Sequence, residues 1–482
     1  MQFFLRTANQ METMSYPCSP LIPFPTQHEE SSYLLWSPQV VIHPENANMY
    51  DADPSPDQQQ AHEFMDMLIQ EASDLLLQDD LSIVDPLAGF DEKLVGQDNG
   101  NLLVVQEKLM ENSLSDLLLA GASAVDSKDS INASAIVSRL EELIPSIPYR
   151  SYDPSVSSFG HLACYFARGL RSRISGACTE RHLAAAPAPA NRMSACQMLQ
   201  ELSPFIKFVQ FTANQAILEA TVDDLDVHVI DLNVGEGIQW SSFMSDLARH
   251  GRKTFHLTAV TSDANPDTGA HLTAARWLSE FAKSLELPFR YSSLHLRSEE
   301  DLHGFTRSCK GSVIVSCDTT NRSYSSLIKL QMLLLGSVKI LQPKLVILIE
   351  EELFGIGQKP SLGTFSFAEF FCKVLNHFTA VLDSLASCFC GSGYGKCLGL
   401  VEKEMLGPRI EDAVGQCGPM TGGAIGDLEG FRACEISSFN IAQAKMLVGL
   451  FSRGFGVVHE EGRLALCWNA RPLTSVSVWS PM

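Results

Sequence analysis

The sequence predicts an α/β fold: a mainly parallel, methyltransferase-like sheet of the Rossmann type with an antiparallel C-terminal edge, an all-helical cap and a disordered acidic N-terminal tail. Three observations predict this fold. After residue 226, nearly continuous apolar runs alternate with helical patterns, which is typical of a parallel sheet covered on both faces. The C-terminal end has a hairpin pattern instead. Residues 106–225 show only helical periodicity.

Residues 1–105 form the predicted tail. They are rich in Pro, Ser and Gln, and residues 1–100 contain 17 Asp and Glu against 2 Lys and Arg, which is −15 of the net charge of −21. Within the tail, residues 60–95 interleave Leu, Met, Ile and Phe with acids, the composition of an amphipathic activation segment. The alternative interpretation is a transient surface helix without a partner.

The charge and cysteine patterns argue against several classes of function. The remaining residues hold 39 acids and 33 bases, so the chain lacks the broad positive field that direct DNA binding requires. The basic run Ala248–Lys253 is interpreted as cations at a helix C-terminus. Cys388, Cys390, Cys397 and Cys417 lack the paired spacing of a zinc site, so we expect no metal. We also expect no secretory signal and no membrane span.

The cap, residues 106–225, is predicted from helical stripes. The first helix begins near Ser113, and further stripes cover residues 136–144 and 161–170, before a predicted loop at 171–192. Ser203 and Pro204 predict an N-cap and a first helical residue, and Thr212 predicts a helix restart by capping-box spacing. The first stripe is interpreted as core or as the candidate interface with a partner; it consists of Leu114, Leu117, Leu118, Ala122 and Val125.

The core, residues 226–482, is predicted from strands at 227–231, 255–261, 289–296, 312–317 and 344–349, with helices at 239–250, 272–285 and 324–335. A hairpin with Glu461–Gly462 at its turn and a strand at 475–479 follow. This is the plan of S-adenosylmethionine-dependent methyltransferases. His228 is expected to be a packed, hydrogen-bonded strand residue, and Glu350–Glu352 are interpreted as a solvated loop.

The loop after the first strand, in VHVIDLNVGEGIQW (227–240), has the form of a cofactor loop. No lysine follows Gly237, which excludes a P-loop. Trp240 occupies the third glycine position of a dinucleotide fingerprint, where close packing of helix on strand requires glycine.

A methyltransferase loop fits this stretch better, except that Asn233 replaces its first glycine. Asn tolerates a left-handed backbone, but its side chain takes up space that the ligand would need. We expect no bound cofactor. If a ligand does bind, the candidate residues are Asp231, Gly235, Gly237 and Asp263.

These segments resemble the motifs of the plant GRAS family. The residues Val227, His228, Val229, Ile230 and Asp231, followed by Gln239 and Trp240, are similar to its VHIID motif. SPFIKFVQFTANQAILEA resembles the end of its first leucine-rich region, and PKLVILIEEE with FFCKVLNHFTAVLDSL resembles its PFYRE region. LCWNARPL and SVSVWSP, with Trp468 and Trp479, resemble its SAW region. Phe370 and Phe378 depart from the Arg and Tyr common in the PFYRE region.

The resemblance, which is greatest to the nodulation-signalling branch of the family, covers Ser113 to Pro481. It implies a non-enzymatic transcriptional regulator of the nucleus, with the cytoplasm as a second location. It also implies homo- or heterodimers with GRAS proteins, DNA contact through a partner, and roles in nodulation, mycorrhizal signalling and strigolactone biosynthesis. The residues leave open an S-adenosylmethionine-dependent methyltransferase or a small-molecule-binding module that uses the loop 231–237.

Overall fold

The computed structural model describes residues 98–144, 157–176, 189–249, 251, 253–261, 268–306, 311–320, 335, 338–352, 366–389, 394–415, 428, 430–460 and 462–482. The predicted activation segment 60–95 and most of the predicted helix 324–335 lie outside the described residues. Side chains are described from Met110 onward.

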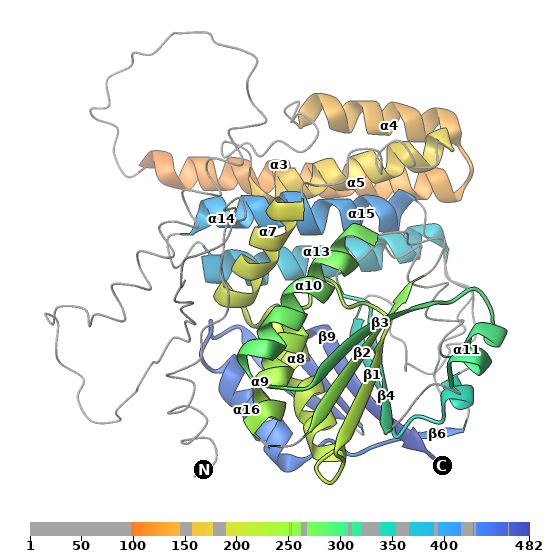
Figure 1. Ribbon diagram of the computed structural model, residues 1–482. Coiled ribbons are helices and arrows are strands. Elements are labelled where there is room, and N and C mark those ends of the chain that lie inside the picture. The colour runs from red at the N-terminus through yellow and green to blue at the C-terminus, as the bar shows by residue number, and fades with distance from the viewer. Residues whose placement is uncertain are drawn as a thin grey trace, which may run out of the picture.

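The core of the protein is one sheet with the strand order β3-β2-β1-β4-β5-β9-β8-β7, and β6 pairs with β9 (Figure 1). Strands β1 to β5 pair in parallel, and the C-terminal strands pair antiparallel. This confirms the predicted fold. The strands are β1 Asp226–Asp231, β2 Thr254–Thr261, β3 Phe289–His295, β4 Ser312–Asp318, β5 Leu345–Glu351, β6 Phe431–Ala433, β7 Phe455–Glu460, β8 Arg463–Trp468 and β9 Arg471–Pro481.

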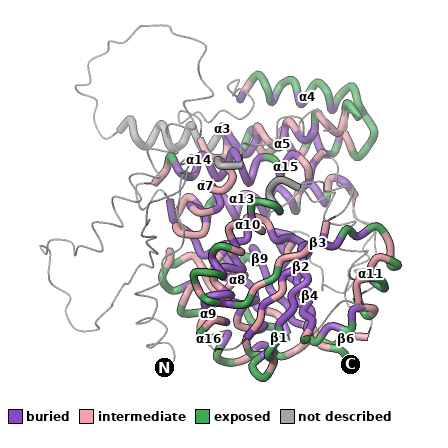
Figure 2. The backbone as a smooth tube through the Cα atoms, viewed as in Figure 1, coloured by how far each residue is buried: buried purple, intermediate pink, exposed green. Residues whose placement is uncertain are grey.

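Apolar side chains on both faces of the sheet explain why these residues form buried strands. Val227 and Val229 of β1 belong to the larger hydrophobic core, whereas the next residue, Ile230, belongs to a second core on the opposite face. The larger core is covered by α8 (Pro204–Ala220), α9 (Ile238–Arg249), α10 (Thr268–Ser284) and α16 (Ser438–Val448). Among the described elements, α11 (Glu299–Thr306) and the 3₁₀ helix η2 (Val338–Leu341) cover the smaller one. Figure 2 shows the strands buried between these layers.

The helical cap is assembled from two distant parts of the chain (Figure 1). Helix α15 packs on α5, α14 on α7 and α13 on α3, so the C-terminal helices join the N-terminal ones. Helix α8 packs instead against β5, β8 and β9. The predicted division into cap and core at residue 225 therefore does not match the packing. The cap helices are α3 Asp98–Asp126, α4 Ser130–Leu143, α5 Ser158–Ser175, α7 Pro189–Leu202, α13 Phe367–Phe389, α14 Gly395–Val401, the π-helix η3 Glu402–Leu406 and α15 Gly407–Gly415.

Some helix boundaries differ from the prediction. Helix α3 begins at Asp98 rather than near Ser113, and α5 and α7 extend into the predicted loop 171–192. The N-cap at Ser203 is confirmed, because its side chain accepts a hydrogen bond from the Phe205 N–H. The predicted restart at Thr212 is wrong: α8 is continuous there, and the Thr212 carbonyl also accepts a hydrogen bond of 2.9 Å from Asn440 of α16.

The apolar stripe of α3 faces the interior of the chain. Leu114, Leu118 and Ala122 are buried in the larger core, and Leu117 and Val125 are half-buried against it. These three residues are therefore core residues, one of the two interpretations of the stripe, because α13 and α5 cover them. Binding of a partner to the remaining surface of α3 stays a prediction.

Candidate functional site at the carboxyl end of β1

The loop between β1 and α9 is held from within by Asp231. The Asp231 side chain is 1% exposed, and each of its oxygens accepts one hydrogen bond from the loop or helix that follows. The Asn233 N–H donates to Oδ1 at 3.0 Å, and the Trp240 indole N–H donates to Oδ2 at 2.8 Å. The indole itself is fully buried. In this structure the acid of the predicted cofactor loop joins the end of β1 to the first turn of α9.

Two glycines give the loop its shape. Gly235 and Gly237 have φ of 55° and 81°, the left-handed region that disfavours side chains. A Cβ at Gly237 would lie 3.1 Å from the Trp277 ring and 3.1 Å from a methyl carbon of Leu278. Asn233 does not adopt a positive φ, so its tolerance of the left-handed backbone is not used.

Side chains from neighbouring helices cover the outside of the loop. The Trp277 indole of α10 donates to the Glu236 carbonyl at 2.9 Å, and the Glu236 carboxylate pairs with Arg192 of α7 at 3.0 Å. Gln239 and Asn214 of α8 exchange hydrogen bonds of 3.1 and 3.2 Å. The segments around the motif therefore pack on the loop at the place where a methyltransferase holds its ligand. Sequence reasoning did not identify Trp277 or Arg192, which lie in other helices.

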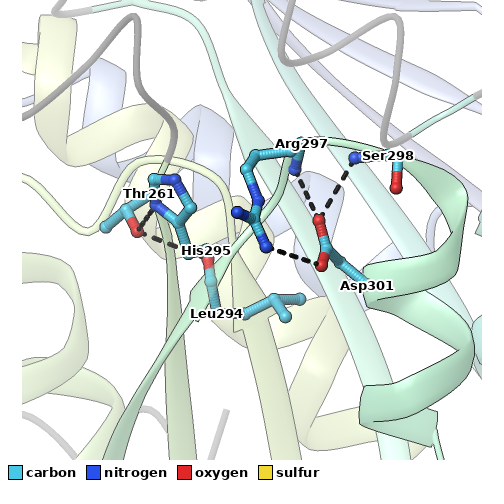
Figure 3. A network of polar contacts seen from close by, with 6 residues as sticks. All are labelled: Thr261, Leu294, His295, Arg297, Ser298 and Asp301. Atoms are coloured by element: carbon cyan, nitrogen blue, oxygen red, sulfur yellow. Dashed lines mark hydrogen bonds and ion pairs between the residues drawn. The ribbon is translucent and has the colours of Figure 1, made fainter.

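The neighbouring ends of β2 and β3 carry polar contacts that order the backbone (Figure 3). Asp301 of α11 accepts hydrogen bonds from the N–H groups of Arg297 at 2.9 Å and Ser298 at 3.2 Å, and these bonds, with the Arg297 guanidinium, lower the pKa of Asp301. The Thr261 hydroxyl lies 3.3 Å from the His295 ring. Asp263, the predicted second candidate acid, lies outside the described residues.

The three glutamates after the fifth predicted strand are not a solvated loop. Glu350 and Glu351 belong to β5 and are buried, and Glu351 forms an ion pair with Arg409 of α15, also buried. Glu352 pairs with Arg463 of β8. The interpretation as a solvated loop was wrong. The two arginines that pair with these acids lie far away in the sequence, so the local pattern did not indicate them. Burial raises the pKa of Asp318, at the end of β4, although Arg409 partly opposes that rise.

His228 is a packed, hydrogen-bonded residue, as the sequence predicted. Its Nε2 lies 2.8 Å from the Thr258 hydroxyl, and its ring stacks on His256 with the centroids 3.9 Å apart. Burial, with a smaller contribution from His256, lowers the pKa of His228 from 6.5 to about 3. It is therefore a neutral structural residue on the sheet face that carries the smaller core.

This pKa shift predicts a loss of stability in mild acid. The unfolded chain binds a proton at His228 below about pH 6.5, whereas the folded chain does so only near pH 3, so stability falls with pH across that window. The free energy of unfolding falls between pH 7.5 and pH 5. We expect this fall to be smaller by up to about 2 kcal/mol in His228→Gln than in the unmodified protein. Urea unfolding at several pH values measures it. If the free energies of unfolding of the variant and of the unmodified protein changed with pH in parallel, His228 would not titrate in this way.

The motif residues of the C-terminal strands also make structural contacts. The Trp468 indole donates to the Asp383 carboxylate of α13 at 2.6 Å, and that of Trp479 donates to the Ser477 hydroxyl at 3.0 Å. Within the described ranges, no group of three or more His, Cys, Asp or Glu side chains is arranged to hold a metal ion. None of the described helices is long and apolar enough to cross a membrane.

These observations define an α/β protein with a mainly parallel sheet, an antiparallel C-terminal edge, a cap made from two distant parts of the chain and a loop after β1 that is held by hydrogen bonds to Asp231. The GRAS domain family model matches residues 114–480. Protein NODULATION SIGNALING PATHWAY 2 of Medicago truncatula is 33% identical over 402 residues, 76% of this chain and 75% of that protein. The Lotus japonicus protein of the same name is also 33% identical, over 396 residues.

A solved structure agrees with this fold. The crystal structure of SCL7 from Oryza sativa superposes with a TM-score of 0.55 at 24% sequence identity, and covers 76% of this chain and 99% of that one. Scarecrow-like protein 26 of Arabidopsis thaliana is 29% identical over 393 residues, 75% of this chain and 76% of that protein. The protein belongs to the GRAS family of transcriptional regulators.

Proposed function

We propose that the protein is a non-enzymatic transcriptional regulator that acts by binding other GRAS proteins and DNA-binding partners. The main support is the loop after β1, in which Asp231 already accepts hydrogen bonds from Asn233 and Trp240 on its two oxygens. A cofactor that needed this carboxylate would have to displace a fully buried indole. The loop therefore organises the junction of sheet and helices.

The proposed biological setting rests on the names of the relatives and on the resemblance to the GRAS family. Two relatives at 33% identity bear the name NODULATION SIGNALING PATHWAY 2. We place the protein in the nucleus, with the cytoplasm as a second location, in nodulation and mycorrhizal signalling and in the control of strigolactone biosynthesis. Its contact with DNA is through a partner, since the chain carries a net charge of −21. It pairs with a GRAS protein through the cap, whose exposed apolar residues include Ile131 of α4.

The role of the tail is tested with a reporter. The chain is tethered to a heterologous DNA-binding domain in plant cells, which removes the need for a DNA-binding partner. We expect that deleting residues 60–95 abolishes most of the reporter activation, because these residues supply the acidic apolar segment. Deleting residues 15–50, a segment of the same length, is the matched control and should leave activation intact. Full activation without residues 60–95, at equal protein levels, would contradict the proposed role of this segment.

A further inference from the structure

Helix α16 has an apolar outer surface. Its inner side buries Asn440, Ala444 and Val448 against the rest of the protein, where it packs on α8 and β7. On its outer side, Ala442, Met446 and Leu450 are spaced four residues apart and are exposed, Met446 by 52% and Leu450 by 57%. This spacing places them on one side of the helix and of the turn that follows it. We call these three residues the α16 stripe.

The segment that carries the α16 stripe has cations and no acids in a strongly acidic protein, and a carboxylate contacts it at the start of the helix, where Ser437 donates to Glu219 of α8 at 2.7 Å. Residues 436–459 contain no Asp or Glu, whereas the chain as a whole carries a net charge of −21. Lys445 and Arg453, both exposed, are the Lys and Arg residues of this segment. An apolar stripe flanked by cations fits an amphipathic helix that carries acids beside its apolar face.

The stripe is too small for a stable contact between two copies of the domain. A standard protein interface takes roughly 20–30 residues from each partner, whereas the stripe, even together with the partly exposed Phe439 of the same helix, offers only a few apolar side chains. A short helix is the occupant that matches this size. A ligand attached to the same chain needs less contact area, because the linker holds it at an effective concentration on the order of millimolar.

The tail of this chain contains a segment with the required chemistry. In residues 63–77, Phe64, Leu68, Ala72 and Leu75 recur at helical spacing. The same residues include four acids and no Lys or Arg: Glu63, Asp66, Glu71 and Asp74.

The chain between this segment and the domain is long enough for the segment to reach the α16 stripe. Residues 78–97 separate it from the start of α3 and can extend to about 66 Å. A globular domain of this size has a radius of gyration of roughly 21 Å, so the extended linker spans about three such radii and can reach a large part of the domain surface. We propose that residues 63–77 bind the α16 stripe of the same chain as an amphipathic helix. This contact is independent of whether the segment activates transcription.

Site-specific photo-crosslinking in the full-length chain tests the contact. Met446 is replaced by p-benzoylphenylalanine, the protein is irradiated, and crosslinked peptides are identified by mass spectrometry. We expect crosslinks within one chain to peptides from residues 60–80. The same crosslinker at Ile131, an exposed apolar residue of α4, is the control and should not give them. Crosslinks that join two chains, or yields no higher than at Ile131, would overturn the proposal.

Charge and sequence variants sharpen the result. With the crosslinker at Met446, Lys445→Glu should lower the yield at least severalfold, because it places an acid beside the acidic segment. Lys283→Glu on α10 makes the same charge change at another exposed position and should have no effect. Leu68→Asp in the segment should abolish the crosslink without a change in the urea midpoint of the domain. An undiminished yield with both Lys445→Glu and Leu68→Asp would refute the contact.

Discussion

Replacing Trp240 by alanine is expected to lower the free energy of unfolding by about 3–5 kcal/mol, the range for removing a fully buried large aromatic side chain. The indole is completely buried, and its ring lies 5.9 Å from that of Phe243 and 6.0 Å from that of Phe255, so the protein would be left with a large cavity. It is also the donor to one oxygen of the buried Asp231 carboxylate.

Trp240→Phe separates these two contributions. It keeps most of the packing but removes the hydrogen bond to Asp231, which we expect to cost about 1–3 kcal/mol because a buried carboxyl oxygen loses its donor. Trp277→Phe is the matched control, since this half-buried indole donates to a carbonyl of the same loop and its loss should cost about 1 kcal/mol. Urea unfolding followed by circular dichroism measures all three variants. A Trp240→Phe variant as stable as the unmodified protein would contradict the structural role of the hydrogen bond.

Replacing Arg409 by methionine is expected to have a similarly large effect. Arg409 and Glu351 are 4% and 1% exposed in their side chains and form an ion pair between α15 of the cap and β5 of the sheet. Removing the cation leaves the buried Glu351 carboxylate without this partner, which typically costs about 3–5 kcal/mol. The Nε2 of His377 lies 3.7 Å from Glu351, which is too distant for a hydrogen bond that could take the place of the ion pair with Arg409.

The double variant Arg409→Met, Glu351→Gln distinguishes a charge effect from a packing effect. Removing both charges should recover more than half of the stability lost by Arg409→Met, because replacing a buried pair by neutral groups is often close to neutral. Urea midpoints and slopes of the two single variants and the double variant complete the cycle. Equal losses in Arg409→Met and the double variant would show that packing, and not the unpaired charge, determines the loss.

The sheet could be predicted from the sequence because its signals are local. Each parallel strand is a short apolar run, and the runs at 227–231 and 255–261 correspond to β1 and β2 within one residue. Asp231 and Trp240 were both identified as important to the loop, since they lie in one motif. The hydrogen bond from the Trp240 indole to Asp231 could not be derived, because spacing in the sequence does not specify where an indole nitrogen points.

The arrangements that the sequence did not predict depend on distant residues. The stripe around Leu118 was correctly placed on a helix, but periodicity cannot tell whether an apolar stripe is covered by the same chain or by a partner. In the structure α13, which begins at Phe367, covers it. The burial of Glu351 similarly depends on Arg409, 58 positions later. A run of acids looks the same in the sequence whether its carboxylates are hydrated or form ion pairs with a buried guanidinium.

We propose that the loop at the carboxyl end of β1 is a structural junction and not a cofactor site. Isothermal titration calorimetry of the full-length protein with S-adenosylmethionine tests it most directly. We predict no saturable heat at ligand concentrations up to about 1 mM, because Asn233, Trp240 and Trp277 already contact the groups that the ligand would use. Saturable binding with a dissociation constant below about 1 mM, lost in Asp231→Asn, would contradict this account.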